Sequence, residues 1–215
     1  MMRSLILSAC IILTTPVISK EASIENIKNV SSEQWEEVKN NKGVVTYVRW
    51  QFQSDGTKTR ERLGDMQADC SLKKTVEVLT DPAETRKWMS GVSENYLLSK
   101  SNPSEWYTYT LYSIPWPFNN RDLVSVFALK NIPGNKTVII NIDSKADHVP
   151  PKPGIERLKD YNATWTITET APQKVHIVFS AMSNTPPMFP RYIQDPIIEK
   201  MFHNNLVRLR ELLSE

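Results

Sequence analysis

Cysteine, runs of basic residues and long apolar segments are all scarce in this chain. Of its 215 residues only Cys10 and Cys70 are cysteine. No five consecutive residues are all Lys or Arg, and the formal net charge is +2, so a nucleic-acid-binding surface is not supported. The apolar stretch from Leu5 to Leu13 is shorter than the roughly 20 residues of an ordinary membrane-spanning helix. What remains is a globular protein long enough for one large domain or two very small ones.

The short motifs of common enzymes and metal sites are absent as well. There is no Gly-x-Ser-x-Gly, no Gly-x-Gly-x-x-Gly, no Cys-x-x-Cys and no His-Glu-x-x-His. His148, His176 and His203 lie far apart, whereas zinc ligands usually come in closely spaced pairs. We therefore expect structural or surface histidines, a small buried Cys70, no metal, no cofactor and no catalysis.

The N-terminus has the pattern of a secretory signal. A short basic start precedes the apolar stretch, and a small, turn-prone segment ends at Ser19. This order predicts a signal peptide over residues 1–19 and one exported domain over residues 20–215, periplasmic or secreted. With cleavage after Ser19, Cys70 is the only cysteine left and no internal disulfide is expected.

Two alternatives to a cleaved signal stay open. Leu7-Ser8-Ala9-Cys10 resembles a bacterial lipoprotein box, which would make Cys10 a lipid-anchored first residue. The same segment could also be the first helix of a cytosolic protein.

The first part of the mature chain reads as a helix followed by a hairpin. Ser31 to Val38 has capping-box and helical spacing, which predicts a helix that ends at Gly43. Val44 to Phe52 alternates and predicts a half-buried strand. An Asp55-Gly56 turn connects it to a returning strand from Thr59 to Cys70.

Two short helices and a long run of strands come next. Apolar spacing predicts a helix from Leu72 to Leu79, and Asp81 with Pro82 begins a second one. Turn signals then separate six predicted strands: Asn95–Lys100, Trp106–Ser113, Asp122–Lys130, Thr137–Ser144, Ala163–Glu169 and Lys174–Ala181. The proline-rich segment from His148 to Tyr161 interrupts them, and a functional loop and a solvated excursion are equally consistent with it.

The chain ends in a predicted long amphipathic helix. Its apolar residues recur at helical spacing: Ile198, Phe202, Leu206, Leu209 and Leu213. The order of elements predicts an α+β fold, with a curved antiparallel sheet of about eight strands around one long helix. Bulky residues on both faces of Trp106–Ser113 and Asp122–Lys130 either line a pocket or form ordinary core, and the pattern does not decide between these.

One segment is more specific than a hydrophobic pattern. Pro115-Trp116-Pro117-Phe118, followed by Arg121-Asp122 and an apolar strand, resembles the signature of the START domain family of lipid-binding proteins. Cys70 to Trp88 resembles the family's helix pair, and the proline-rich segment falls where the family carries its omega loop. The resemblance covers roughly residues 25–213. It implies a helix-grip fold, with a tunnel for one lipid and with the long helix and the omega loop as its gate.

The resemblance also says which charges are missing. Sterol-binding members have a cavity arginine where this chain has Phe127, and an acid near the place of Thr108. Without that pair we expect an apolar or weakly polar ligand end at this depth. Arg121 and Asp122 are expected to hold the turn rather than the ligand.

Together these patterns predict a non-catalytic, monomeric protein that binds and transfers a lipid or another hydrophobic molecule, with transient membrane contact and no nucleic acid. The predicted ligand-lining residues are Thr108, Tyr109, Leu111, Phe127, Leu129, Met182, Ile198 and Phe202. One alternative is an enzyme like the polyketide cyclases and aromatases on the same scaffold, using Tyr109, His176 or Arg49. Another is an interaction module whose core is filled and which has no cavity.

Overall fold

The computed structural model describes residues 34–52, 56–114, 119–134, 136–187 and 189–215. Trp35–Glu215 form one compact unit. The predicted signal peptide, the lipoprotein box, Asp55 of the hairpin turn and Pro115–Phe118 of the family signature lie outside the described residues.

One curved sheet dominates the unit. Its strands run in the order β1-β2-β3-β10-β9-β7-β6-β5-β4, all antiparallel, while the short β8 pairs in parallel with β6. The strands are β1 (Glu36–Asn41), β2 (Val44–Phe52), β3 (Lys58–Ala68), β4 (Val92–Asn102), β5 (Glu105–Tyr112), β6 (Asn120–Ile132), β7 (Thr137–Ser144), β8 (Ile155–Arg157), β9 (Tyr161–Ala171) and β10 (Lys174–Ser183). The six strands predicted after residue 94 are confirmed.

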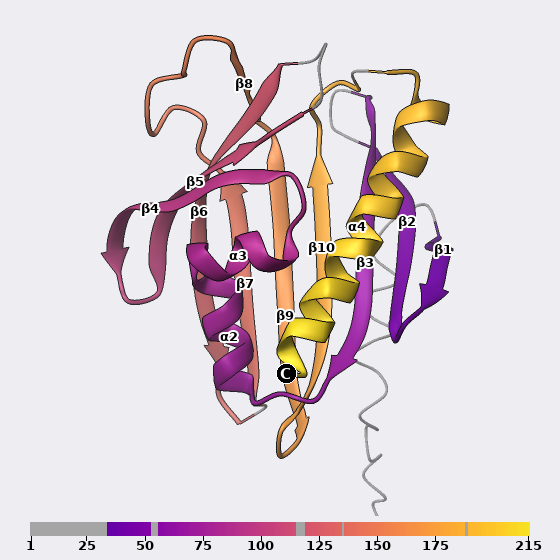
Figure 1. Cartoon of the computed structure of the whole chain (residues 1–215), viewed down its shortest axis with the longest axis vertical. Coiled ribbons are helices and arrows are strands. Elements are labelled where there is room, and N and C mark those ends of the chain that lie inside the picture. The colour runs from indigo at the N-terminus through magenta and orange to yellow at the C-terminus, as the bar shows by residue number, and fades with distance from the viewer. Residues whose placement is uncertain (1–33, 53–55, 115–118, 135, 188) are drawn as a thin grey trace, which may run out of the picture. The chain divides into compact units, whose positions relative to one another are not determined.

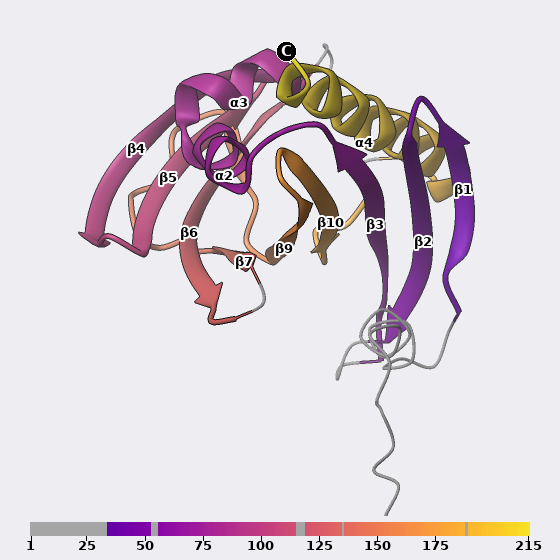
Figure 2. The same ribbon diagram turned by 90° about the horizontal axis from the view of Figure 1, so that it is seen from below.

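Three helices lie on the concave side of this sheet. They are α2 (Leu72–Thr80), α3 (Pro82–Trp88) and α4 (Arg191–Leu213). Figures 1 and 2 show the strands as an arc from β4 to β1, with α2, α3 and α4 across its open side. The expectation of a long C-terminal helix gripped by a curved sheet is confirmed, and we call the concave side of the sheet its inner face.

The predicted first helix is wrong, because Glu36–Asn41 form the edge strand β1. Asn41 pairs with Val44, so Lys42 and Gly43 make a two-residue hairpin loop. Both have positive φ, 52° and 73°, as a type I′ turn requires. Gly43 therefore turns a hairpin rather than ending a helix. The glutamates and lysine of β1 keep this exposed edge polar.

Side-chain caps begin both short helices, and the Asp81 cap of α3 is the one that the sequence predicted. The Ser71 side chain accepts a hydrogen bond from Lys74 N, and the Asp81 side chain accepts one from Ala83 N at 2.8 Å. Pro82 occupies the first turn of α3, where its missing N–H costs nothing. These caps set α2 and α3 at an angle in a short span of chain.

Helix α4 packs tightly against the middle of β3. A Cβ on Gly64 would overlap the Leu206 side chain. The helix and the sheet therefore meet at a glycine, as a close approach demands. The buried core lies at this junction and includes Val44, Met66, Ile177, Leu206 and Leu209.

Candidate ligand-binding site

Strand alternation decides which predicted residues face the helices. Phe127 and Leu129 pack on the main core under the helices, so alternate residues of β6 share that inner face. Thr108 pairs with Ser125 across the sheet and donates to or accepts from its hydroxyl at 3.2 Å. Phe202 of α4 lies over the same face, and Ile198 is half-buried one turn before it. Five of the eight predicted residues therefore point into one region.

The other three predicted residues lie on the opposite face of the sheet. Tyr109 and Leu111 form a separate buried cluster with Val124, and Met182 follows the inner Ala181 on β10. Because side chains alternate along a strand, Tyr109 and Leu111 cannot share a face with Thr108. The structure thus corrects the predicted lining at these three positions.

The proline-rich segment covers that outer cluster. Val149 and Ile155 pack on Tyr109, Leu111 and Val124. Lys152 Nζ lies 4.0 Å from the centre of the Tyr109 ring, and the nearby Tyr109 raises the pKa of Lys152. In the described residues the segment is held to the outer face, not over the helices.

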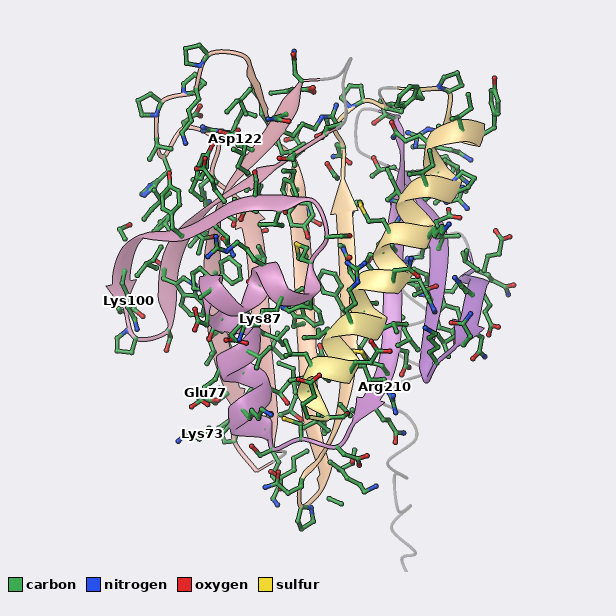
Figure 3. All side chains as sticks on the ribbon, viewed as in Figure 1. Lys73, Glu77, Lys87, Lys100, Asp122 and Arg210 are labelled. Carbon is green, nitrogen blue, oxygen red and sulfur yellow. The ribbon has the colours of Figure 1, made fainter. Side chains whose placement is uncertain are left out.

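Asp122 and Arg121 of the family signature hold this segment in place. Arg157 donates to both Asp122 oxygens, at 2.6 and 2.9 Å, and to the carbonyls of Ala146 and Val149. Arg121 is bidentate to Glu156. Figure 3 shows Asp122 at the end of the sheet nearest the proline-rich segment. Arg121 and Asp122 were expected to hold the turn, whose residues 115–118 lie outside the described residues. Their described partners, Glu156 and Arg157, are in the proline-rich segment.

Aromatic rings connect α4 to the inner face and to α3. Phe202 stacks on Phe179 with ring centres 5.6 Å apart, and Phe179 stacks on Trp165 at 3.9 Å. Trp165 meets Trp88 edge-on at 6.0 Å, and on the neighbouring strands Trp106 stacks on Phe127. These rings form a continuous apolar lining between the sheet and the helices.

Part of this lining is not fully buried. Phe127, Leu129, Phe202 and Ala181 retain intermediate exposure although all four pack on the main core, whereas Ile140 and Ile177 are completely buried. Ala181 pairs with Ala163, so two small side chains lie next to each other on the inner face. The inner face therefore offers accessible apolar surface between the sheet and the helices.

The N-terminal half of α4 is joined to the sheet by buried charges. Arg60 Nη1 donates to Asp195 Oδ2 at 3.2 Å, and Arg60 Nη2 lies 3.3 Å from Glu199 Oε1. Arg62 Nη2 lies 3.6 Å from Asp195 Oδ1. Burial raises the pKa of Glu199 and lowers that of Arg62. We call Arg60, Arg62, Asp195 and Glu199 the ion cluster.

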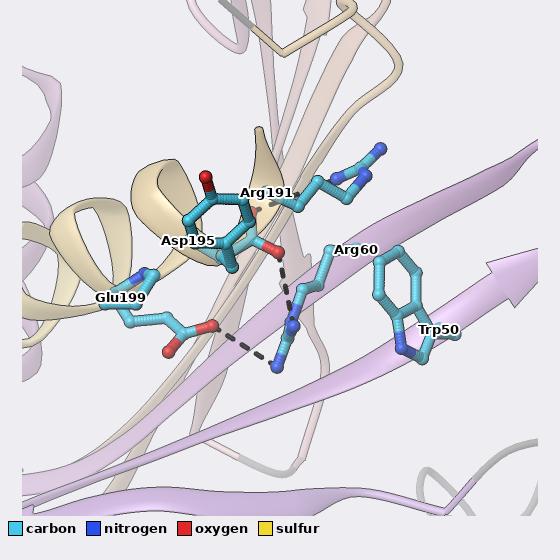
Figure 4. A pocket seen from close by; sticks show the side chains of 7 residues that line it. Trp50, Arg60, Arg191, Asp195 and Glu199 are labelled. Carbon is cyan, nitrogen blue, oxygen red and sulfur yellow. Dashed lines mark hydrogen bonds and ion pairs between the residues drawn. The ribbon is translucent and has the colours of Figure 1, made fainter. Parts of the chain in front are cut away.

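A shallow pocket of about 300 Å³ opens beside the ion cluster (Figure 4). Arg60 and Arg191 both lie 5.2 Å from the Trp50 ring that forms its wall. A second open pocket, of about 580 Å³, lies by the stacked rings of Tyr107 and His148. Both pockets are open to solvent and both have charged side chains in their lining, so neither is the enclosed apolar cavity that the sequence led us to expect.

The C-terminal half of α4 is held by hydrogen bonds to uncharged partners. His203 Nε2 donates to Asn41 Oδ1 at 2.8 Å, and its Nδ1 lies 3.4 Å from the Thr46 hydroxyl. Burial, together with Lys39 and Lys42, lowers the pKa of His203. Asn205 Oδ1 accepts from Ser90, and Arg210 Nε donates to the Gln67 carbonyl. Figure 3 shows Arg210 near the C-terminal end of the helix, beside β3.

Sequence patterns missed the polar residues of this region. Arg60 and Arg62 precede the apolar part of β3, and Asp195 lies 135 residues away from Arg60. Asp195 and Glu199 are four residues apart, which is a same-face signal, but only the tertiary structure supplies their partners. Tyr112 and Tyr161 on the inner face were also missed.

Metal-ligand groups and membrane-spanning helices were sought in the part of the chain that the structure describes. No three His, Cys, Asp or Glu residues there are grouped to hold a metal ion, and Cys70 is buried and free. None of the described helices is both long enough and apolar enough to span a bilayer.

Solved structures with this arrangement of elements include StAR-related lipid transfer domains. A STAR-related lipid transfer protein from Xanthomonas axonopodis is 27% identical, with a TM-score of 0.72 over 83% of this chain and 98% of that chain. Human StAR-related lipid transfer protein 5 has a TM-score of 0.71 at 15% identity, covering 90% and 91% of the two chains. Human STARD10 has a TM-score of 0.66 at 19% identity, covering 92% and 81%. These similarities confirm the predicted helix-grip fold.

Sequence comparison adds one relative. A protein of Pseudomonas aeruginosa with no assigned function is 22% identical over 183 residues, which are 85% of this chain and 88% of that protein. No protein family model matches the sequence.

Proposed function

We propose that this chain, which has the helix-grip fold of the START lipid transfer domains, binds a lipid or a similar hydrophobic molecule between the inner face of its sheet and α4, without catalysing a reaction. The observation that carries the proposal is the partly exposed apolar lining between the sheet and the helices, formed around Phe127, Phe202 and Ala181. Removing apolar ligand surface from water contributes about 25 cal/mol per Å².

Exchange of the ligand requires α4 to move away from the sheet. Its first turns, up to Glu199, are joined to the sheet by the ion cluster, and we propose that this is the part that water releases most readily. The N-terminal half of α4 exposes Tyr192, Ile193, Ile197 and Met201 to solvent. We propose that this exposed apolar row contacts a membrane surface while the ligand is transferred.

Export by a cleaved signal peptide, to the periplasm or beyond, and action as a monomer are further parts of the proposal. They rest on the sequence pattern of residues 1–19 and on the single-domain organisation of Trp35–Glu215.

Mass spectrometry of an organic extract of the purified protein, residues 20–215, tests the binding proposal. We expect a lipid at close to one molecule per chain. Ala181→Leu, which adds bulk on the inner face, should release it. Ser180→Leu on the outer face of the same strand is the matched control and should retain it. An extract free of lipid from a folded wild-type protein, together with no uptake of added lipid, would contradict the proposal and favour a filled core.

A further inference from the structure

Two tyrosines stand at one end of the inner face. Tyr112 is the last residue of β5 and follows Thr108 and Thr110 on the same face. Tyr161 is the first residue of β9, packs on the main core and pairs with Ser183 at the end of β10. The chain runs from Ser183 into α4, so both tyrosines lie at the end of the sheet where α4 begins.

Both tyrosines are deep within the protein yet keep accessible surface. Burial raises the pKa of Tyr112 to about 12 and also raises the pKa of Tyr161, and the nearby Tyr112 adds to the second effect. Both side chains nevertheless retain intermediate exposure. Such a group is only partly covered by protein and can still be reached by a small molecule.

The two hydroxyls have no hydrogen-bond partner among the described residues, unlike the other hydroxyls of this face. Thr108 is paired with Ser125 at 3.2 Å, and Thr110 donates to Asn95 Oδ1 at 3.1 Å. A hydroxyl in an apolar interior loses free energy unless it is hydrogen-bonded. Among these hydroxyls of the inner face, those of Tyr112 and Tyr161 are therefore available to bond to a ligand.

The surroundings of the two tyrosines are unfavourable for a charged ligand group. Burial is the only cause that raises the pKa of Tyr112, and no charged side chain in the described residues contributes to either tyrosine. Arg121, the strand neighbour of Tyr112, is already bidentate to Glu156. A carboxylate or an ammonium group placed here would lose its hydration without gaining a counter-ion.

We propose that the hydroxyls of Tyr112 and Tyr161 together bind the uncharged polar end of the hydrophobic ligand, such as an alcohol, an ester or an amide. The inference rests on the proposed function, since it needs a ligand on the inner face. The ligand's apolar part then lies along Phe127 and Phe202, and its polar end points toward the start of α4.

Competition binding tests the pair. N-phenylnaphthylamine serves as the fluorescent apolar probe, and dodecanol, dodecane and dodecanoate serve as competitors with equal chain length. For the wild type we expect dodecanol to displace the probe about tenfold better than dodecane, as two modest hydrogen bonds allow, and dodecanoate to be the weaker polar competitor.

Tyr112→Phe/Tyr161→Phe should bind the probe as tightly as the wild type but lose the preference for dodecanol, and each single variant should lose part of it. Tyr107→Phe, on the same strand but the outer face, should keep the full preference. A wild type that binds the probe without preferring dodecanol, or a double variant that keeps the preference, overturns the inference alone. A folded wild type that binds no probe overturns the proposed function and this inference with it.

Discussion

At the scale of single residues, the ion pairs of this protein differ in how far they are buried. Asp122 and Arg157 have side chains that are 1% and 5% exposed, so each depends on the other for its charge. Arg121 and Glu156, one position along, form a similar pair that is open to water. Arg121 and Asp122 thus form one exposed and one buried ion pair. We expect the two pairs to contribute very different amounts to the free energy of unfolding.

Arg157→Met should therefore be much more harmful than Arg121→Met. The first leaves the buried Asp122 carboxylate without its partner, and we expect a loss of about 3–5 kcal/mol in the free energy of unfolding. The second removes an exposed pair, with an expected loss below about 1 kcal/mol. Urea unfolding monitored by circular dichroism measures both, and equal losses would contradict this assignment.

His203 should make the protein less stable in acid. Its folded-state pKa is lowered, so the folded protein binds fewer protons than the unfolded chain. Its contribution is complete above the unfolded pKa of about 6.5 and is lost as pH falls below that value. Asn41, Thr46, Lys39 and Lys42 surround the ring, and none of the four is an anion that would stabilise the protonated imidazolium.

Unfolding experiments at pH 8 and pH 5 with His203→Gln test this. We expect the variant to be less stable than the wild type at the higher pH but to lose less stability on acidification, by about 1 kcal/mol or more. His176 provides the contrast, because its hydrogen bond to Asp65 raises its pKa. Its contribution is complete below the unfolded pKa and is lost as pH rises through the folded value, so His176→Gln should steepen the acid loss.

At the scale of elements, α4 combines two modes of attachment. Its C-terminal half packs through Leu206, Leu209 and Leu213, which are nearly or completely buried. Its N-terminal half carries Asp195 and Glu199 against Arg60 and Arg62. Because ionic contacts are replaced by water more readily than apolar contacts, the two halves are expected to open with different free energies.

Hydrogen exchange measured by mass spectrometry can separate the two halves. Asp195→Asn/Glu199→Gln should speed exchange in the first half of α4 and leave the segment around Leu209 protected. Glu211→Gln, an exposed acid on the same helix, is the matched control and should change neither half. Uniform acceleration along the whole helix would show that α4 is released as one body.

At the scale of the whole molecule, the exposed apolar row of α4 is the proposed membrane contact. Ile193 and Ile197 are 42% and 59% exposed. Ile193→Ser/Ile197→Ser should slow transfer of a fluorescent lipid between vesicles several-fold, because less apolar surface enters the bilayer, while equilibrium lipid binding stays unchanged. Val38→Ser removes an exposed apolar side chain from the edge strand β1 instead of from α4 and should not slow transfer. Equal effects of the two changes would argue against a docking role for α4.

The sequence alone determined the local elements of this protein. Period-two alternation and turn residues predicted six strands after residue 94, helical spacing predicted α4, and Asp81 with Pro82 predicted the start of α3. These signals are local because hydrogen bonds, caps and turns join residues a few positions apart. The same locality explains the error at β1, whose charged residues suit an exposed helix and an edge strand equally well.

Only the tertiary structure decided which strand faces form the inner surface. Alternation shows that Thr108 and Tyr109 lie on opposite faces, but not which of them meets α4, because that choice depends on pairings such as β3 with β10. The ion cluster likewise joins residues 135 positions apart. Buried charges need a partner of opposite charge, and here the partner comes from a distant segment of the chain. The residue spacing within one segment therefore does not predict such a contact.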